Sequence, residues 1–183
     1  MSPNDPDDFH AELIALVTQR ALARHAAMPA FRDWLEREAG PDDWHDVAMR
    51  WNWDFGRDVL TWITRQKWCD RATALLLFWK SRPDYFVAFG GVRAAVPEVN
   101  RDGFDFVQEL RSRWRAGDYV RAELHFDLAE ELRPDFAELD GRFGERAAIE
   151  LPLDMRGPLS GRVLEPTGMI EGIPARFWPE DLR

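Results

Sequence analysis

Apolar residues recur at intervals of three and four along much of the chain, a pattern typical of helices packed on a shared core. This spacing predicts amphipathic helices over residues 9–26, 30–39, 41–51, 57–66, 71–80 and 101–117. In the first helix the recurring apolar residues are Phe9, Leu13, Leu16, Val17 and Ala21. Pro29 is expected to open the second helix, and Gly40 with Pro41 separates it from the third. We therefore expect a mainly α protein, built as a compact multi-helix domain.

The pattern changes in the last quarter of the chain, where proline and glycine become frequent. Apolar residues alternate with polar residues or proline over residues 149–154, a period of two that predicts a strand, and Pro152 would confine that strand to a sheet edge. We expect a helical domain over residues 1–140. Residues 141–183 are expected to form an extended segment packed on it, with room for a short β-hairpin.

Five of the nine tryptophans lie between residues 50 and 79. An indole ring is normally buried while its N–H finds a partner, so this concentration indicates either a core or a binding site. Trp51 and Trp79 of this region fall on predicted buried faces, as does Trp44 just before it. Two others, Trp53 and Trp68, lie in predicted turns. We therefore expect a partner to contact Trp53, Asp54, Asp58 and Trp68.

The polar residues between these helices also have a structural interpretation. Asn52 can end one helix in a left-handed turn, and Asp54 can cap the next. Asp70 is in the right place to cap the helix over residues 71–80. Cys69 is expected to be a small buried residue, because no histidine or catalytic signature adjoins it. Asn52, Asp54, Cys69 and Asp70 together form the predicted structural motif.

Composition narrows the classes of function. The net charge of −9 argues against binding to a nucleic-acid backbone, and it favours a basic protein partner. The longest apolar run, residues 72–79, is too short for a membrane span, which needs about 20 residues. The acidic start of the chain has no apolar signal core, and a single cysteine excludes an internal disulfide. We therefore expect a cytoplasmic protein without a membrane segment.

Motifs for catalysis or cofactor binding are weak. The four histidines have no metal-ligand spacing, and the chain has neither a serine nucleophile elbow nor a phosphate-binding loop. We therefore predict no metal, no cofactor and no catalytic residue. Carboxylates are plentiful, and a catalytic pair among them stays open because their pKa values depend on burial.

The segments "NWDFG" (52–56), "VLTWI" and "CDRATALLLFW" (69–79) resemble the bacterial domain of unknown function 4274. The resemblance covers roughly residues 44–80, and it can continue through "RSRWRAGDYVRAELHFD" to residue 127. It implies no established activity. By analogy with small bacterial proteins of this kind, it implies a protein that binds a toxin, such as an immunity protein. The residues that it singles out are Asn52, Trp53, Asp54, Cys69 and Asp70.

Three functions of different classes stay open. The leading hypothesis is a non-enzymatic partner-binding protein, namely a cytoplasmic immunity protein that neutralises a toxin, such as a basic toxin domain, by direct binding. The second is a small hydrolase or transferase that uses carboxylates of the turn over residues 52–58. The third is an oligomeric scaffold closed by residues 141–183. The sequence leaves the oligomeric state and the partner's identity open.

Overall fold

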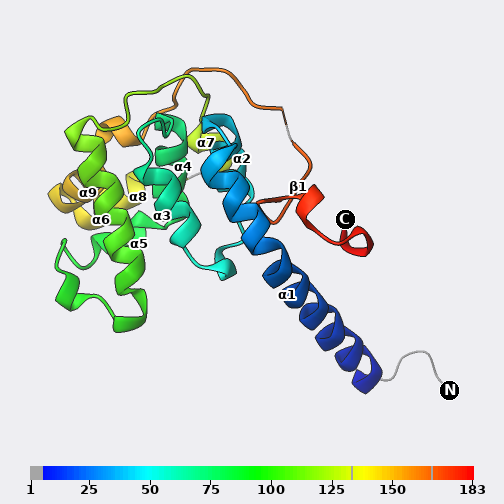
Figure 1. Ribbon diagram of the computed structural model, residues 1–183. Helices are drawn as coiled ribbons and strands as arrows, with labels where there is room; N and C mark the ends of the chain where they lie inside the picture. Colours follow the sequence, from blue (N-terminus) through cyan, green and yellow to red (C-terminus); the bar gives the residue numbers. More distant parts are fainter. Residues whose placement is uncertain (1–5, 133, 166) are drawn as a thin grey trace.

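The computed structural model describes residues 6–132, 134–165 and 167–183, and it confirms the mainly α fold (Figure 1). The helices are α1 (Pro6–Arg37), α2 (Pro41–Arg50), α3 (Asp58–Arg65), α4 (Arg71–Lys80), α5 (Pro83–Val87), α6 (Arg101–Ala116), α7 (Leu128–Glu131), α8 (Phe136–Phe143) and α9 (Glu145–Glu150). Two short antiparallel strands, β1 (Met169–Ile170) and β2 (Ile173–Pro174), follow. Short 3-10 turns lie between these elements, among them η1 (Trp53–Phe55) and η4 (Leu153–Met155).

Helix α4 is the centre of the core. Every residue from Ala72 to Trp79 is buried, and α4 contacts α2, α3, α5 and α6. A helix that is apolar on all sides is stable only when it is covered on all sides. The run "ATALLLFW" therefore fixes the position of the helices around it, including α3, α5 and α6, which carry the candidate site.

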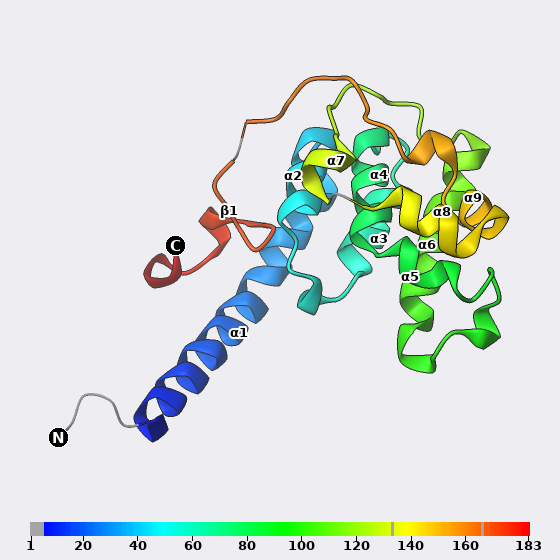
Figure 2. The same ribbon diagram turned by 180° about the vertical axis from the view of Figure 1, so that it is seen from behind.

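Helix α1 is one continuous helix of 32 residues, so the predicted break at Pro29 is wrong. A proline inside a helix removes one backbone hydrogen bond and crowds the preceding turn. Ala27 and Phe31 on either side of it are both buried against the core, and their packing holds the two turns in line. The N-terminal part of α1 stands away from the rest of the molecule (Figures 1 and 2).

Residues 141–143 belong to α8 and residues 145–150 to α9, so the expected extended segment begins only after them. The proposed boundary after residue 140 falls within α8. The strand predicted over residues 149–154 is wrong, because this stretch is the end of α9 followed by η4. Ala147 and Glu150 are buried at helical spacing, and the Glu150 carboxylate forms an ion pair with Arg111 of α6. That contact with α6 favours a helix over the strand that the local alternation indicated.

A β-hairpin forms further along, between β1 and β2. Its turn residues, Glu171 and Gly172, have φ angles of 53° and 83°. Positive φ at both central residues is typical of a tight two-residue hairpin turn. The hairpin lies beside the middle of α1, and the backbone N–H of Asn52 donates to the carbonyl oxygen of Glu171 at 3.3 Å (Figure 1). The C-terminal segment is thus fastened to the helical body.

Candidate functional site

The turn between α2 and α3 positions the first candidate residues. Trp51 is buried at the end of α2, and its indole N–H donates to the carbonyl oxygen of Gly56 at 2.9 Å. The Asn52 side chain accepts the backbone N–H of Asp54 at 3.0 Å and so caps η1. These two bonds close the turn "NWDFG" and hold Trp53 half-buried against the core.

Two expectations for this turn are wrong. Asn52 has a φ of −77°, which is not left-handed, because its side chain starts a new turn instead of ending α2. Asp54 does not cap α3, because the 3-10 turn shifts the start of that helix to Asp58, and the residue before it is Arg57. The Asp54 side chain is exposed to solvent.

Asp70 and Cys69 lie at the start of α4. One Asp70 carboxylate oxygen accepts the backbone N–H of Ala72 at 2.9 Å, which confirms the predicted cap. Cys69 is buried, as expected, and burial raises the pKa of its thiol to about 12. A thiol in this state is not a nucleophile near neutral pH.

Trp53 lines a hollow of about 330 Å³ between η1, α5 and the start of α6, which we call the η1–α5 hollow. Its other wall residues include Arg57, Arg82, Tyr85 and Phe86. Three aromatic rings therefore line it together with three cationic side chains, those of Arg57, Lys80 and Arg82. Such a combination of aromatic and arginine side chains is typical of the energetically important part of protein interfaces.

A second hollow, of about 450 Å³, lies between α3 and α6 and shares Arg57 with the first. We call it the α3–α6 hollow. Four carboxylates line it: Asp58 from α3, and Asp102, Asp105 and Glu109 from α6. The three α6 carboxylates recur at intervals of three and four, which places them on one face of the helix.

Arginines hold three of these carboxylates. Glu109 receives two hydrogen bonds from Arg65, from Nε at 2.6 Å and from an Nη at 2.8 Å. Asp105 is paired with Arg93, and Asp58 with Arg32 of α1. The fourth, Asp102, is exposed and forms no ion pair within 4.0 Å among the described residues. The hydrogen bond from Arg65 holds the pKa of Glu109 below its ordinary value.

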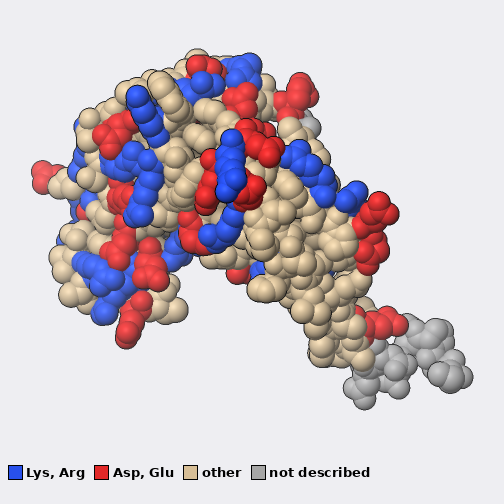
Figure 3. Space-filling view, in the orientation of Figure 1, with Lys and Arg blue, Asp and Glu red and all other residues tan. Residues whose placement is uncertain are grey.

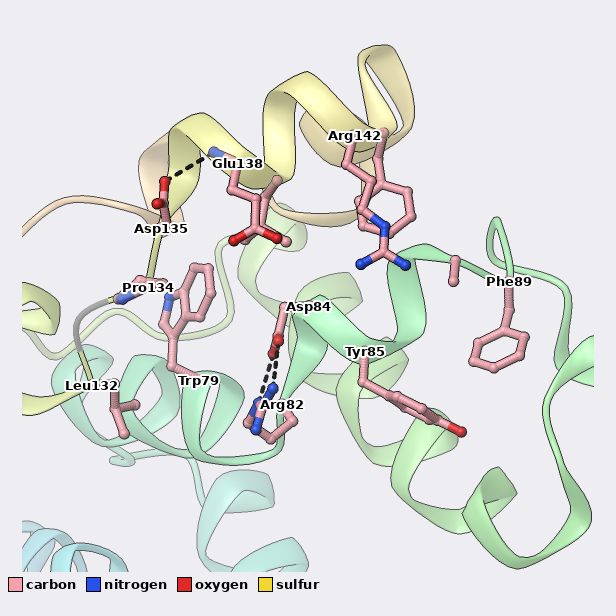
Figure 4. A pocket seen from close by; sticks show the side chains of 13 residues that line it. Trp79, Arg82, Asp84, Tyr85, Phe89, Leu132, Pro134, Asp135, Glu138 and Arg142 are labelled. Atoms are coloured by element: carbon pink, nitrogen blue, oxygen red, sulfur yellow. Dashed lines mark hydrogen bonds and ion pairs between the residues drawn. The ribbon is translucent and has the colours of Figure 1, made fainter.

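A third hollow, of about 750 Å³, lies between α5 and α8 (Figure 4). Arg82, which also lines the η1–α5 hollow, makes a bidentate ion pair with Asp84 at 3.0 and 2.8 Å. Arg82 has a φ of 55°, an uncommon conformation for a residue other than glycine. Glu138 and Arg142 of α8 point toward α5 (Figure 4). The hollow is not predictable from local spacing, because it depends on how α8 packs over α5, an element far from it in the sequence.

The structure does not bring all four predicted contact residues together. Trp53 and Asp58 line the adjoining η1–α5 and α3–α6 hollows. Trp68 follows the other end of α3, is 54 % exposed, and has the Lys67 amine 4.8 Å from its ring centre. Asp54 and Trp68 line none of the three hollows.

Residues that the sequence did not single out complete the site. Arg57 joins the two smaller hollows, and Asp102 and Glu109 supply carboxylates. The spacing of the α6 acids was visible in the sequence, but their meeting with α3 was not. In the described part of the chain, His, Cys, Asp and Glu side chains form no group of three or more that could hold a metal ion. No helix among the described residues is both long and apolar enough to span a membrane.

The site lies in a segment that matches a family model. No curated protein and no solved structure matches the chain. A family model does match residues 39–115, a range that contains every residue lining the η1–α5 and α3–α6 hollows. It includes the whole of residues 44–80, where the resemblance was predicted, and ends before residue 127. The predicted resemblance is thereby confirmed, because residues 39–115 match the model of the family described as Domain of unknown function (DUF4274).

Proposed function

We propose that this chain is a non-enzymatic protein that binds a basic protein partner through its η1–α5 and α3–α6 hollows. The partner would place a lysine or arginine side chain in the α3–α6 hollow and an apolar group against Trp53. Both hollows lie within the DUF4274 segment and share Arg57, so one contact surface can cover them.

The observation that carries this proposal is the arrangement of carboxylates on α6. Asp105 and Glu109 are already paired with arginines of this chain, whereas Asp102 is exposed in the same hollow without an ion pair to a described residue. A cation from a partner would complete the row of ion pairs. Charge-assisted hydrogen bonds of this kind are stronger than neutral ones and give an interface its specificity.

The charge state of the hollow favours binding over acid–base catalysis. A carboxyl group that acts as a general acid near neutral pH needs a raised pKa. Glu109 has the opposite property, because the hydrogen bond from Arg65 lowers its pKa and keeps it ionised. The alternative hydrolase hypothesis depends on the carboxylates of the turn over residues 52–58. Asp54 is exposed and lines none of the three hollows, whereas Asp58 lines the α3–α6 hollow but is paired with Arg32.

Within this class we propose an immunity protein, which neutralises a basic toxin domain by covering it. The net charge of −9 supports this choice, since it accelerates encounter with a basic partner and weakens binding to nucleic acid. Such a protein would act in the cytoplasm, where the toxin would otherwise reach its target.

The test is rescue of cells that express the product of the adjacent reading frame. The wild-type chain is expected to restore growth and to co-purify with that product. The Asp102→Arg variant should lose both effects, because it places a cation where the partner's cation would bind. Glu165→Arg is the matched control, since Glu165 is exposed and lines neither hollow. Growth restored equally by the wild type and Asp102→Arg would refute the α3–α6 hollow as the contact surface, and failure of the wild type would refute the immunity function.

A further inference from the structure

The outer part of α1 presents an apolar surface to solvent. Six large apolar side chains on it are between 46 and 67 % exposed: Phe9, Leu13, Ile14, Leu16, Val17 and Leu22. On the face that Figure 3 shows, this projecting part is mostly free of charged groups, whereas both signs of charge are interspersed over the body. Phe9, Leu13 and Leu16 lie on one side of the helix, whereas Ile14 and Leu22 lie on the other. A group of exposed large apolar side chains often marks an interaction site.

This surface continues one that is already buried. Ala23, Ala27 and Phe31 of α1 pack against the core, and Leu16 and Phe9 lie on the same side of the helix, further out. These five residues form an apolar stripe along one side of α1, which runs from the body into solvent. An unpacked helix in water has little stability, and the β-branched Ile14 and Val17 lower it further. A covering partner would therefore stabilise the outer turns of α1.

The charges beside the stripe indicate which partner. Glu12, Leu16 and Arg20 follow one another at intervals of four residues and form one ridge along the helix. Arg20 is 3.6 Å from the Glu171 carboxylate of the hairpin, yet about half of its side chain stays exposed. The ridge thus has an anion at one end, a cation at the other and leucine midway between them.

We propose that α1 pairs with the α1 helix of a second copy of this chain, in antiparallel orientation, with Leu16 at the two-fold axis. In this register each Glu12 lies opposite Arg20 of the other copy, and Leu16 meets its own equivalent. A parallel pair would set Glu12 against Glu12 and Arg20 against Arg20, which like-charge repulsion disfavours. The contact is self-complementary, as a two-fold interface requires.

A lipid surface is a poorer occupant of the same stripe. Helices that bind membrane surfaces carry lysine and arginine along their polar face, which attract anionic lipids. The outer part of α1, residues 6–22, instead has the acids Asp7, Asp8 and Glu12 against Arg20 as its one arginine or lysine, and the chain as a whole has a net charge of −9. The proposal stands apart from the binding of a basic partner through the α3–α6 hollow, which uses residues 56–109.

Sedimentation equilibrium of the full chain tests the pairing and its register. The wild type is expected to be a dimer. Glu12→Arg alone and Arg20→Glu alone should each weaken self-association by tenfold or more, because each creates two like-charge contacts per dimer. The double variant, with both changes, should restore it. Glu36→Arg, on the opposite side of α1, is the matched control and should remain a dimer.

A disulfide cross-link tests the position of the two-fold axis. Leu16→Cys should give a covalent dimer on oxidation, whereas Ala11→Cys, which faces away from the stripe, should not. Cys69 is buried and will not compete. A wild-type chain that is monomeric over the whole concentration range, or one that stays monomeric while partitioning onto lipid vesicles, would overturn the proposal. If the double variant self-associates no better than Glu12→Arg, the antiparallel register that pairs Glu12 with Arg20 is overturned.

Discussion

One carboxylate oxygen of Asp70 accepts the backbone N–H of Glu123 at 2.9 Å, although the two residues are 53 positions apart. The other oxygen caps α4 through the N–H of Ala72, also at 2.9 Å. Asp70 is fully buried, and the Arg121 guanidinium lies 3.5 Å from its carboxylate. A single side chain thus joins the start of the central helix to the strand-like segment after α6.

Replacing Asp70 by Asn should lower the free energy of unfolding by about 2 kcal/mol, because a neutral amide replaces an anion that accepts two backbone N–H groups. Urea unfolding followed by circular dichroism measures this loss. Asp54→Asn is the matched control, since the Asp54 side chain is exposed and its replacement should change stability by less than about 0.5 kcal/mol. Equal stability of Asp70→Asn and the wild type would contradict the structural role of the Asp70 carboxylate.

Helices that show a regular spacing of apolar residues within their own segment could be predicted from the sequence. The helices α2, α3, α4 and α6 lie where the spacing of three and four placed them. The cap at Asp70 was also predictable, because capping depends on one side chain and the next two residues. The continuity of α1 through Pro29 was not, because it depends on core residues that contact Phe31 from elsewhere in the chain.

The candidate site was predictable only in part, for a similar reason. Trp53 and Asp58 were selected because they lie in or beside a turn, and both do line hollows. The same argument predicts a partner contact at Trp68, yet Trp68 lies at the other end of α3. The α3–α6 hollow forms because α4 holds α3 and α6 side by side, and this tertiary packing leaves no trace in local spacing.

Cys69 should be unreactive in the folded protein. Burial raises the pKa of its thiol to about 12, so almost none of it is thiolate at pH 8. Ellman's reagent should therefore detect no thiol in the native chain within minutes. It should detect one thiol per chain after unfolding in urea. The variant Ser160→Cys adds an exposed thiol and should react at once. Rapid reaction of the native wild-type chain would contradict the buried state of Cys69.

Gly172 should be required for docking of the hairpin. A Cβ atom on it would lie 2.8 Å from the Trp51 Cα, and its φ of 83° is unfavourable for any other residue. Gly172→Ala should therefore destabilise the protein by about 2 kcal/mol, from overpacking and backbone strain together. Urea unfolding measures the change. Gly168→Ala is the matched control, since nothing lies within 4 Å of the added Cβ and its φ is not in the left-handed range. Equal losses in the two variants would count against hairpin docking on Trp51.

His45 should make stability depend on pH. Its ring is buried with Nδ1 at 2.9 Å from the Thr73 hydroxyl, and desolvation lowers its pKa from 6.5 to about 4 despite the nearby Asp46 and Asp42. Between these two values the unfolded chain binds a proton that the folded chain excludes, so acid favours unfolding. Between pH 7.5 and pH 5 this residue should cost about 2 kcal/mol of unfolding free energy.

Urea unfolding at the two pH values isolates this contribution when variants are compared. His45→Gln removes the titrating group and should be less stable at pH 7.5 but show a smaller loss on going to pH 5. His10 is exposed on α1, so His10→Gln should keep the wild-type dependence. If His45→Gln lost as much stability between pH 7.5 and pH 5 as the wild type, the loss would have to come from other groups, and burial of a neutral His45 would not govern the acid sensitivity of the fold.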